Sequence, residues 1–330
     1  MNVISLFSGC GGLDLGFIRA GFNVVWSNEF DQTIHSTYRM NFPYSTLIEE
    51  NIIDINSNNI PDCDGIIGGP PCQAWSEGGK GLGLKDNRGK VFLQYLRIIR
   101  DKKPRFFLIE NVRGLLSVTH INVFNKIIQN LSSYGYSVKY ALLNAKDFQI
   151  PQDRIRLFIV GFRNDRDNLF QFPQPINKPF ITLKQAIGDI TIEPRGFIST
   201  VVKNELSGSL SNHDYYTGVF DEKYMSRNRV RGWDEASFTI QALAKNIPIH
   251  PQAPKMQYVS QNKRIFKTGF ESLYRRLSIR ECARIQTFSD KFIFNYSDIK
   301  DGYKMIGNAV PPRLAYHLAK QIYTYYKQII

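Results

Sequence analysis

The stretch Asp64-Gly65-Ile66-Ile67-Gly68-Gly69-Pro70-Pro71-Cys72 joins a short apolar segment to a turn with two consecutive prolines. The apolar residues predict a buried strand. Each proline fixes its φ angle at about −65°, removes a backbone donor and disfavours helix in the residue before it. The sequence therefore predicts that Cys72 lies on a rigid turn at the carboxyl end of a strand, where open α/β sheets bind ligands.

Two interpretations of Cys72 are open at this point. A lone cysteine is more often a small buried hydrophobic residue, and the glycines at 78, 79, 81 and 83 then belong to an ordinary loop. Alternatively, the turn is a rigid mount for a nucleophile, and the glycine-rich segment after it can move. Motifs elsewhere in the chain favour the second interpretation.

The N-terminus has the order strand, turn and helix. Residues 2–7 are apolar, Ser8-Gly9-Cys10-Gly11-Gly12 follows, and residues 13–20 have helical spacing. Glycines let a ligand approach the backbone closely, so this order is typical of a nucleotide-type binding loop. Glu29 lies about twenty residues beyond the glycines, where an acidic residue commonly binds ribose hydroxyls. Alone, such a loop is a weak signal, because unrelated cofactors use it.

Strand-like and helix-like segments alternate up to residue 160, which predicts a doubly wound, mostly parallel α/β sheet. Because the first strand begins at residue 2, we expect the C-terminal helix to return and cover the sheet. We predict a catalytic and cofactor-binding domain over residues 1–165, completed by 302–330, and a smaller, irregular, mostly β domain over 166–301. The predicted strands are 23–27, 46–49, 65–68, 106–109, 138–143 and 157–160, and the predicted helices are 32–41, 91–100, 123–131 and 313–326.

The chain of 330 residues carries a formal net charge of +13. Residues 222–284 hold thirteen Lys or Arg against five Asp or Glu, and such a local basic excess predicts a polyanionic partner. The four cysteines, at 10, 63, 72 and 282, have no metal-ligand spacing, so we expect free thiols and no metal. We find no signal peptide and no apolar run of membrane-spanning length, and we expect a cytoplasmic protein.

Three further motifs carry polar groups. Glu110-Asn111-Val112 follows an apolar strand, where desolvation raises the pKa of a carboxyl group and lets it hold a proton; an ordinary exposed Glu is the competing interpretation. In Gln152-Asp153-Arg154-Ile155-Arg156 the two arginines face one side of a strand, and surface ion pairs are the competing interpretation. Gly307-Asn308-Ala309-Val310-Pro311 predicts a turn before the last helix.

With these motifs in order, the chain resembles the bacterial DNA (cytosine-5)-methyltransferases over essentially its whole length. The resemblance implies a Rossmann-like, S-adenosylmethionine-dependent sheet, a target-recognition domain, and double-stranded DNA as the partner. Residues 86–89 fit a weaker intermediate motif of the family, and residues 276–286 resemble the segment that supports recognition. The six specific motifs, in family order, are the segments 7–12, 69–73, 110–112, 152–156, 276–286 and 307–311.

The resemblance implies that Cys72 is the nucleophile, adding to C6 of a cytosine that has left the duplex. A free thiol titrates at about 8.5 and needs activation for this role. Glu110 would share a proton with the cytosine N3, Arg156 would hold O2, and Arg154 would position a phosphate or the cysteine loop. The other DNA contacts expected in this domain are Gln73, Ser76 and Arg88.

The implied cofactor is S-adenosylmethionine, with S-adenosylhomocysteine as the product. Glu29 would bind the ribose hydroxyls, and Phe7 and Phe30 would flank the adenosyl group. Where the family usually has Asp before Ile, this chain has Asn51-Ile52, and an Asn carbonyl accepts the same hydrogen bond without a charge. The remaining expected cofactor contacts are Gly9, Cys10, Gly12, Leu13, Pro70, Asn308 and Ala309.

Sequence recognition is expected in the second domain. Arg227, Arg229 and Arg231 alternate along a segment that we expect to be extended, so they would share one face. Arginine is the usual bidentate reader of guanine, and phosphate contact alone is the competing interpretation. Together with Gln241 and Lys245, this region resembles the methyltransferases of GGCC-specific restriction-modification systems. Lys245 stands where those enzymes can have Arg, so another G·C-rich palindrome competes with GGCC.

Three other functions remain to be separated from this one. RNA cytosine-5 methyltransferases acting on tRNA share the nucleophile motif, but the long basic segment after Phe180 favours DNA. A nucleotide-dependent oxidoreductase would explain Glu29 but not the Pro-Pro-Cys turn. A DNA-binding module without catalysis would need neither Cys72 nor Glu110. We expect a monomer, with a cognate restriction endonuclease acting on the same site.

Overall fold

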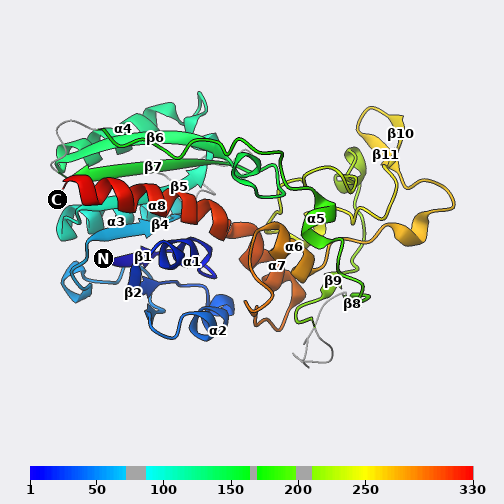
Figure 1. Ribbon diagram of the computed structural model, residues 1–330, viewed down its shortest axis with the longest axis horizontal. Coiled ribbons are helices and arrows are strands. Elements are labelled where there is room, and N and C mark those ends of the chain that lie inside the picture. The colour runs from blue at the N-terminus through cyan, green and yellow to red at the C-terminus, as the bar shows by residue number, and fades with distance from the viewer. Residues whose placement is uncertain (72–86, 164–168, 198–209, 330) are drawn as a thin grey trace.

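The computed structural model describes residues 1–71, 87–163, 169–197 and 210–329 (Figure 1). The predictions for Cys72, Gln73 and Ser76 lie outside these residues, as does the side chain of Arg88. The described chain has two parts: a sheet covered by helices, and an irregular part, residues 169–297, which lies at one end of the sheet (Figure 1).

Within the described residues, seven strands form one mixed sheet. They are β1 (Asn2–Leu6), β2 (Asn23–Asn28), β3 (Thr46–Ile48), β4 (Gly65–Gly68), β5 (Phe106–Val112), β6 (Tyr136–Asn144) and β7 (Ile155–Arg163). Their order is β3-β2-β1-β4-β5-β7-β6; neighbours from β3 to β5 are parallel, and β7 is antiparallel to β5 and β6. The predicted doubly wound, Rossmann-like fold is confirmed, with β7 as the antiparallel exception. The strand order reverses at β1 and β4, and ligands bind beyond the carboxyl ends of strands at such a point.

Helices cover both faces of the sheet, which is why the central strands β4 and β5 are buried and largely apolar. Along β5, Phe106 and Leu108 pack with α1 (Gly12–Arg19) and α8 (Pro312–Ile329), whereas Phe107 and Ile109 pack with α3 (Asn87–Lys102) and α4 (Ile121–Ser133). The expectation that the C-terminal helix covers the sheet is therefore confirmed. The helix α2 (Gln32–Asn41) lies beside β2 and β3. None of the helices that the structure describes is long and apolar enough to cross a membrane.

The irregular part consists mostly of loops with short elements between them (Figure 1). Its described strands have three or four residues each and pair two by two, so the irregularity is as predicted and the strand content is small. The predicted domain boundaries stay predictions. The elements are α5 (Leu183–Ile187), β8 (Arg195–Phe197), β9 (Asp214–Tyr216), β10 (Gln257–Ser260), β11 (Lys263–Ile265) and α6 (Ile279–Ile285), followed by α7 (Ile299–Asn308), which leads back to the sheet.

Short 3₁₀ turns complete the described secondary structure. The 3₁₀ turns are Ser57–Asn59, Arg113–Leu116, Ala145–Phe148, Tyr224–Ser226, Ala244–Asn246 and Glu271–Leu273.

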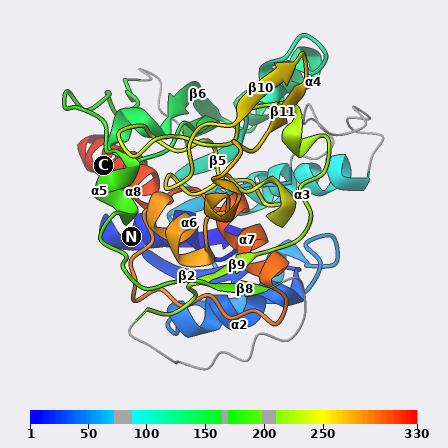
Figure 2. The same ribbon diagram turned by 90° about the vertical axis from the view of Figure 1, so that its right-hand side faces the viewer.

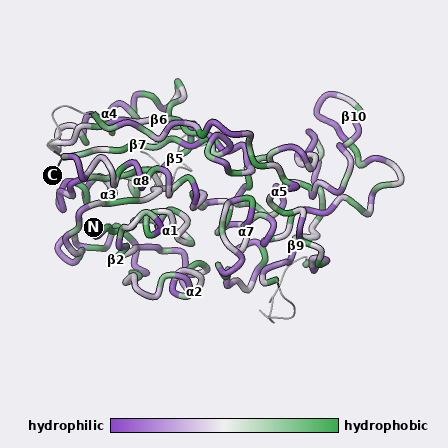
Figure 3. Tube along the Cα trace, viewed as in Figure 1, coloured by the Kyte–Doolittle hydropathy of each residue, from purple (hydrophilic) through white to green (hydrophobic). Residues whose placement is uncertain are grey.

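Figure 2 looks onto the irregular part and shows α6 and α7 near its centre, in front of the sheet. The trace around β10 is largely hydrophilic in Figure 3, and all four residues of this strand are exposed.

Buried arginines stabilise the irregular part in place of long strand ladders. Arg276 is 1% exposed and donates to three backbone carbonyls in residues 216–219. Arg280 is fully buried and also donates to three backbone carbonyls. A buried carbonyl without a partner is unfavourable, so these side chains satisfy loops that cannot satisfy themselves.

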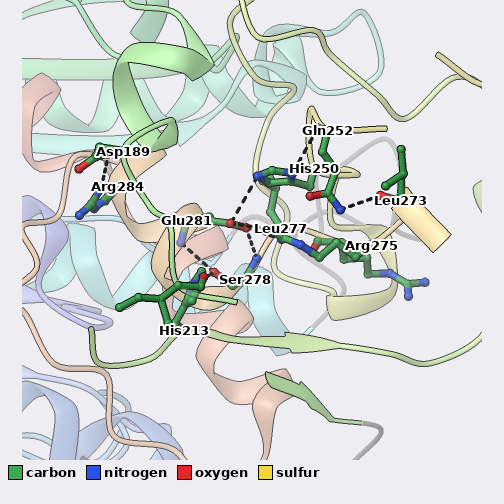
Figure 4. A network of polar contacts seen from close by, with 12 residues as sticks. Asp189, His213, His250, Gln252, Leu273, Arg275, Leu277, Ser278, Glu281 and Arg284 are labelled. Carbon is green, nitrogen blue, oxygen red and sulfur yellow. Dashed lines mark hydrogen bonds and ion pairs between the residues drawn. The ribbon is translucent and has the colours of Figure 1, made fainter. Parts of the chain in front are cut away.

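A second buried network begins at the N-terminus of α6 (Figure 4). The Glu281 carboxylate accepts two bonds of 2.8 Å from the Arg275 guanidinium and one of 2.8 Å from the Ser278 N–H. Ser278 accepts from the Glu281 N–H in return, which completes a capping box. Burial by itself would raise the pKa of Glu281, but the bonds and charge of Arg275 bring it below its ordinary value. Burial lowers the pKa of the neighbouring His250 to about 4, so this imidazole is neutral at pH 7.

Candidate active site

A cavity of about 280 Å³ lies beyond the carboxyl ends of β1, β4 and β5. Five segments contribute to its wall: the glycine turn (residues 8–12), the proline turn (69–71), the acid motif (110–112), the two arginines of the segment 152–156, here called QxRxR, and the turn at 307–311, here called the closing turn. The fold thus brings together, at the strand-order reversal, motifs that are distant in sequence. The predicted site residues that line it are Phe7, Gly9, Cys10, Gly12, Leu13, Glu29, Pro70, Glu110, Arg154, Arg156, Asn308 and Ala309.

The glycine turn depends on conformations and spacings that a side chain would disturb. Gly9 and Gly11 have φ angles of 54° and 84°, in the left-handed region that favours glycine. A Cβ at Gly12 would lie 2.4 Å from the Val310 carbonyl oxygen. The glycine turn and the closing turn are therefore in direct contact, and both face the cavity.

The Glu29 carboxylate holds the glycine turn from the end of β2. One oxygen accepts from the Gly9 N–H and the other from the Asp31 N–H, both at 2.8 Å. Burial raises the pKa of Glu29, against the opposing effect of these hydrogen bonds. Each carboxylate oxygen keeps a lone pair for a further donor, so the site fits the diol of a ribose.

Three predicted cofactor residues do not line this cavity. Phe30 is 62% exposed, and Ile52 packs in the hydrophobic core with an exposed fraction of 2%. The Asn51 side-chain oxygen accepts from the Ile53 N–H at 3.2 Å, which shapes its own loop. Their contacts with a cofactor stay predictions.

Glu110 and Arg156 form a largely buried ion pair at the cavity wall. The Arg156 Nε lies 3.1 Å from a Glu110 oxygen, and their side chains are 16% and 12% exposed. Burial raises the pKa of Glu110, while the charges of Arg156 and Arg154 act in the opposite direction. The protonated form of this carboxyl group is therefore more favoured than in an exposed glutamate.

Asn111 has a structural role that the sequence did not predict. Its Nδ2 donates to the Pro70 carbonyl at 3.3 Å, and the residue is 2% exposed. The amide therefore fixes the proline turn to the strand that carries Glu110. The signal for this role was the position of Asn111 beside Glu110, but the sequence did not show which backbone group it would meet.

Arg154 is 1% exposed, and its terminal nitrogens donate to backbone carbonyls of Ile240, Gly307 and Ala309. Both arginines of QxRxR line the cavity, as predicted, but in different surroundings. Arg156 reaches the acid motif, whereas Arg154 joins Ile240 of the irregular part to residues 307–309 before the last helix. The predicted contact of Arg154 with a phosphate or with the cysteine loop stays a prediction.

The three cysteines within the described residues are poor nucleophiles. Burial raises the pKa of the Cys10 and Cys63 thiols to about 12 each, and it also raises that of Cys282. The Cys10 Sγ lies 3.4 Å from the Met305 carbonyl oxygen, to which it donates. Cys10 therefore contributes shape to the cavity wall and no thiolate.

The sequence model of the family described as "C-5 cytosine-specific DNA methylase" matches residues 1–324. The chain belongs to this family. It is thus a DNA (cytosine-5)-methyltransferase, and membership implies that S-adenosylmethionine is its methyl donor. The cavity supports this cofactor, since the glycine turn, the closing turn and the Glu29 carboxylate, whose oxygens can accept further hydrogen bonds, all line it.

Relatives of this methylase resemble it over nearly their full length. It is 49% identical over 323 residues to the type II methyltransferase M.MthTI of Methanothermobacter thermautotrophicus, covering 98% of this chain and 97% of the relative. It is 49% identical over 324 residues to M.FnuDI of Fusobacterium nucleatum, covering 98% and 94%. Among solved structures, the Entamoeba histolytica methyltransferase EhMeth superposes with a TM-score of 0.74 at 20% identity, covering 99% and 98%, which shows the shared fold alone.

The arginines predicted to read DNA in this methylase do not share one exposed face. Arg227 is exposed, but Arg229 is 8% exposed and donates to the Tyr224 carbonyl at 2.8 Å. The expectation of three arginines on one face is therefore wrong at Arg229, which is buried. No strand forms over residues 227–231, where only Val230 makes an isolated bridge, to Ile249. Arg231 is half-buried and pairs with Glu235 at 3.0 Å.

The other two predicted recognition residues lie just beyond a buried anchor at Ile240. Gln241 is half-buried and accepts from the Asn246 side chain at 3.0 Å. Lys245 is exposed and lies 3.3 Å from an Asp221 oxygen. The exposed Lys245 is accessible to a partner. The contacts of Gln241 and Lys245 with DNA stay predictions.

Proposed function

We propose that this methylase transfers a methyl group from S-adenosylmethionine to C5 of a cytosine flipped out of duplex DNA at GGCC. Its role would be the protective half of a restriction-modification system. The observation that carries the proposal is the Glu110–Arg156 pair in the same cavity as the Glu29 glycine turn. Relatives named type II methyltransferases support the biological setting. Another G·C-rich palindrome remains the competing target.

Cys72 would begin the reaction. Its thiolate adds to cytosine C6, a C–S bond forms, and the electrons of the C5–C6 double bond move into the ring, so that C5 becomes nucleophilic. S-adenosylmethionine supplies an electrophilic methyl group when bound. After methylation a base, such as water, would take the proton from C5. The C5–C6 double bond then re-forms, the C6–S bond breaks, and its electrons leave on the sulfur as the Cys72 thiolate. Because C6 cannot be reached inside a duplex, the base must leave the stack first.

Glu110 and Arg156 would assist this addition from the cavity wall. The raised pKa of Glu110, caused by burial, favours a carboxyl group that can give its proton to N3 as electrons enter the ring. Arg156 beside it offers guanidinium donors for O2 and a positive charge that stabilises the electron-rich base. Together they would place the cytosine face over the proline turn that Asn111 holds.

Cofactor binding would use other residues of the cavity lining. Glu29 accepts the ribose hydroxyls, while Phe7 and Pro70 provide apolar contacts and Asn308 a polar one. These four residues face the same space, which supports a single elongated ligand across the glycine turn. The methyl donor would then lie next to the Glu110 wall, where the flipped cytosine is expected.

Mapping of 5-methylcytosine tests the proposal. The full chain and its Cys72→Ala variant are expressed in cells that have no cytosine-5 methylation, and plasmid DNA and tRNA are sequenced after bisulfite treatment. We expect methylation of plasmid DNA at GGCC with the wild type and none with Cys72→Ala. Methylation at another motif would overturn only the GGCC assignment. Methylation of tRNA without plasmid methylation would favour the RNA alternative, which the match to a DNA methylase family does not support.

A further inference from the structure

The segment proposed to read DNA is anchored to the catalytic part at Ile240. This residue is fully buried; its N–H donates to the Gln152 side-chain oxygen at 2.9 Å, and its carbonyl accepts from Arg154 at 3.1 Å. The adjoining Thr239 hydroxyl donates to the Asp153 carbonyl. Immediately afterwards the chain becomes accessible, since Leu243 is 57% exposed. Residues 241–245 therefore project from a point that QxRxR fixes.

The same side chains hold the cofactor turn. Arg154 donates to the carbonyls of Gly307 at 2.8 Å and Ala309 at 2.9 Å. Gln286 accepts from Gln152 at 2.9 Å and donates to the Ile306 carbonyl at 2.8 Å. Gln152 and Gln286 are 0% exposed. These bonds satisfy carbonyls at the C-terminus of α7, where a positive charge is favourable.

The two segments are also in direct backbone contact. A Cβ at Gly307 would lie 2.3 Å from the Ala242 nitrogen and 2.3 Å from the Gln241 carbonyl carbon. A displacement of residues 241–242 therefore displaces the turn that carries Asn308 and Ala309. Close-packed interiors transmit such displacements, because neither side can yield without losing contacts.

We propose that Gln152, Arg154 and Gln286 are positioning residues that couple DNA binding at residues 241–245 to cofactor binding at residues 307–309. A duplex that fixes the reading segment also fixes the cofactor turn, so it raises the affinity for the cofactor. By linkage, the cofactor raises the affinity for DNA by the same factor. The inference rests on the proposed function and deepens it.

The dissociation constant of S-adenosylhomocysteine, which cannot donate a methyl group, measures this coupling. It is determined by calorimetry on the full chain, alone and with a saturating duplex that carries the GGCC site. For the wild type we expect the duplex to lower this constant about fivefold or more. Gln286→Met keeps the side-chain volume and removes its two carbonyl bonds and the bond from Gln152. In this variant we expect the factor to fall below about twofold.

Gln149→Met is the matched control. Gln149 is also buried and also donates its Nε2 to two backbone carbonyls, those of Lys178 and Pro179, but it contacts neither coupled segment. Its variant should keep the wild-type factor. Thr239→Val removes the single hydrogen bond from the Thr239 hydroxyl to the Asp153 carbonyl, next to the reading segment. The coupling factor of this variant should fall as well. The test therefore stays decisive if Gln286→Met does not fold.

Four outcomes would overturn the inference: no coupling in the wild type, an unchanged factor in Gln286→Met, an unchanged factor in Thr239→Val, or an equal loss in Gln149→Met. A merely structural role would weaken each binding step separately without changing the ratio. A wild type that binds S-adenosylhomocysteine and DNA but shows no coupling leaves the proposed function standing. A wild type that binds neither refutes both.

Discussion

Buried charge serves different purposes in the sheet and in the irregular part. In the part that contains the sheet, burial raises the pKa of Asp14 in the interior and of Glu29 and Glu110 at the cavity. In the irregular part, Arg275 brings the pKa of Glu281 below its ordinary value despite burial, and Arg276 donates to loop carbonyls. In the first arrangement, burial favours carboxyl groups that can carry and exchange a proton during a reaction. The second satisfies a backbone that has few ladders of its own.

The comparison predicts its largest effect at Glu110. Glu110→Gln removes the proton donor, so we expect kcat to fall by about 10²- to 10⁴-fold. Since burial disfavours the Glu110 anion, the neutral amide should leave the free energy of unfolding unchanged or raise it. Single-turnover methylation and urea unfolding measure the two quantities. Strong destabilisation by this change would contradict the division between the two parts.

The next effect is expected at Arg276. Arg276→Met removes the donor from the buried Gly218 carbonyl and from three partly buried carbonyls, those of Tyr216, Val219 and Lys245. A buried acceptor left unsatisfied costs about 1 to 3 kcal/mol, so we expect a loss of about 2 kcal/mol or more. The control is Arg19→Met in the exposed end of α1, where the change should be within about 0.5 kcal/mol. Urea unfolding of both variants decides; a loss below about 1 kcal/mol at Arg276 would refute the proposed stabilisation.

The two parts should also respond to pH in opposite directions. Burial lowers the pKa of His250 to about 4, so its contribution to stability is present above its unfolded value and is lost as pH falls from about 6.5 towards 4. Burial raises the pKa of Asp14 to about 6, so its contribution is present at low pH and is lost as pH rises from about 4 through 6. Each full change is on the order of 3 kcal/mol.

Thermal unfolding from pH 4 to 7 separates these contributions. Relative to the wild type, His250→Gln should lose less stability on acidification, and Asp14→Asn should gain less. The buried partners that face Asp14 are Ser5 and Tyr38, whose hydroxyls donate to it at 2.6 Å each. Changes of the same sign in the two variants would contradict the assignment.

The smallest expected effect concerns a helix cap in the irregular part. Thr182 and Gln185 form a capping box at the start of α5. Thr182→Ala should lower the free energy of unfolding by about 1 kcal/mol, and Thr182→Ser should restore most of it, because a hydroxyl is sufficient for the cap. Equal stability of the Ala and Ser variants in urea unfolding would show that this cap contributes nothing.

The sequence predicted much of the sheet because its strands and helices have clear periodicity. Residues 106–109 are apolar on both faces, so the sequence predicted a buried strand there. Glu110 follows directly and lines the cavity at the carboxyl ends of the strands, as predicted. Periodicity did not reveal that β7 runs antiparallel, since strand direction depends on pairing and not on side-chain alternation. The cavity lining was predicted well where motifs follow strands.

The irregular part was harder to predict for a physical reason. Its stability depends on side chains that reach distant backbone carbonyls, and no local pattern reveals such partners. Arg229 alternates with Arg227 and Arg231 in the sequence, yet it is buried against Tyr224. Gln286 gave no signal of its link to Gln152, which lies 134 positions earlier. These contacts require the fold to be known.

Covalent trapping tests the central claim most directly. A duplex with 5-fluorocytosine at the target is incubated with the chain and S-adenosylmethionine, then denatured and analysed by mass spectrometry. Because fluorine cannot leave C5 as a proton does, the account predicts a denaturation-resistant complex joined through Cys72 and absent in Cys72→Ala. Failure to form this complex on a duplex whose normal counterpart is methylated would contradict the mechanism.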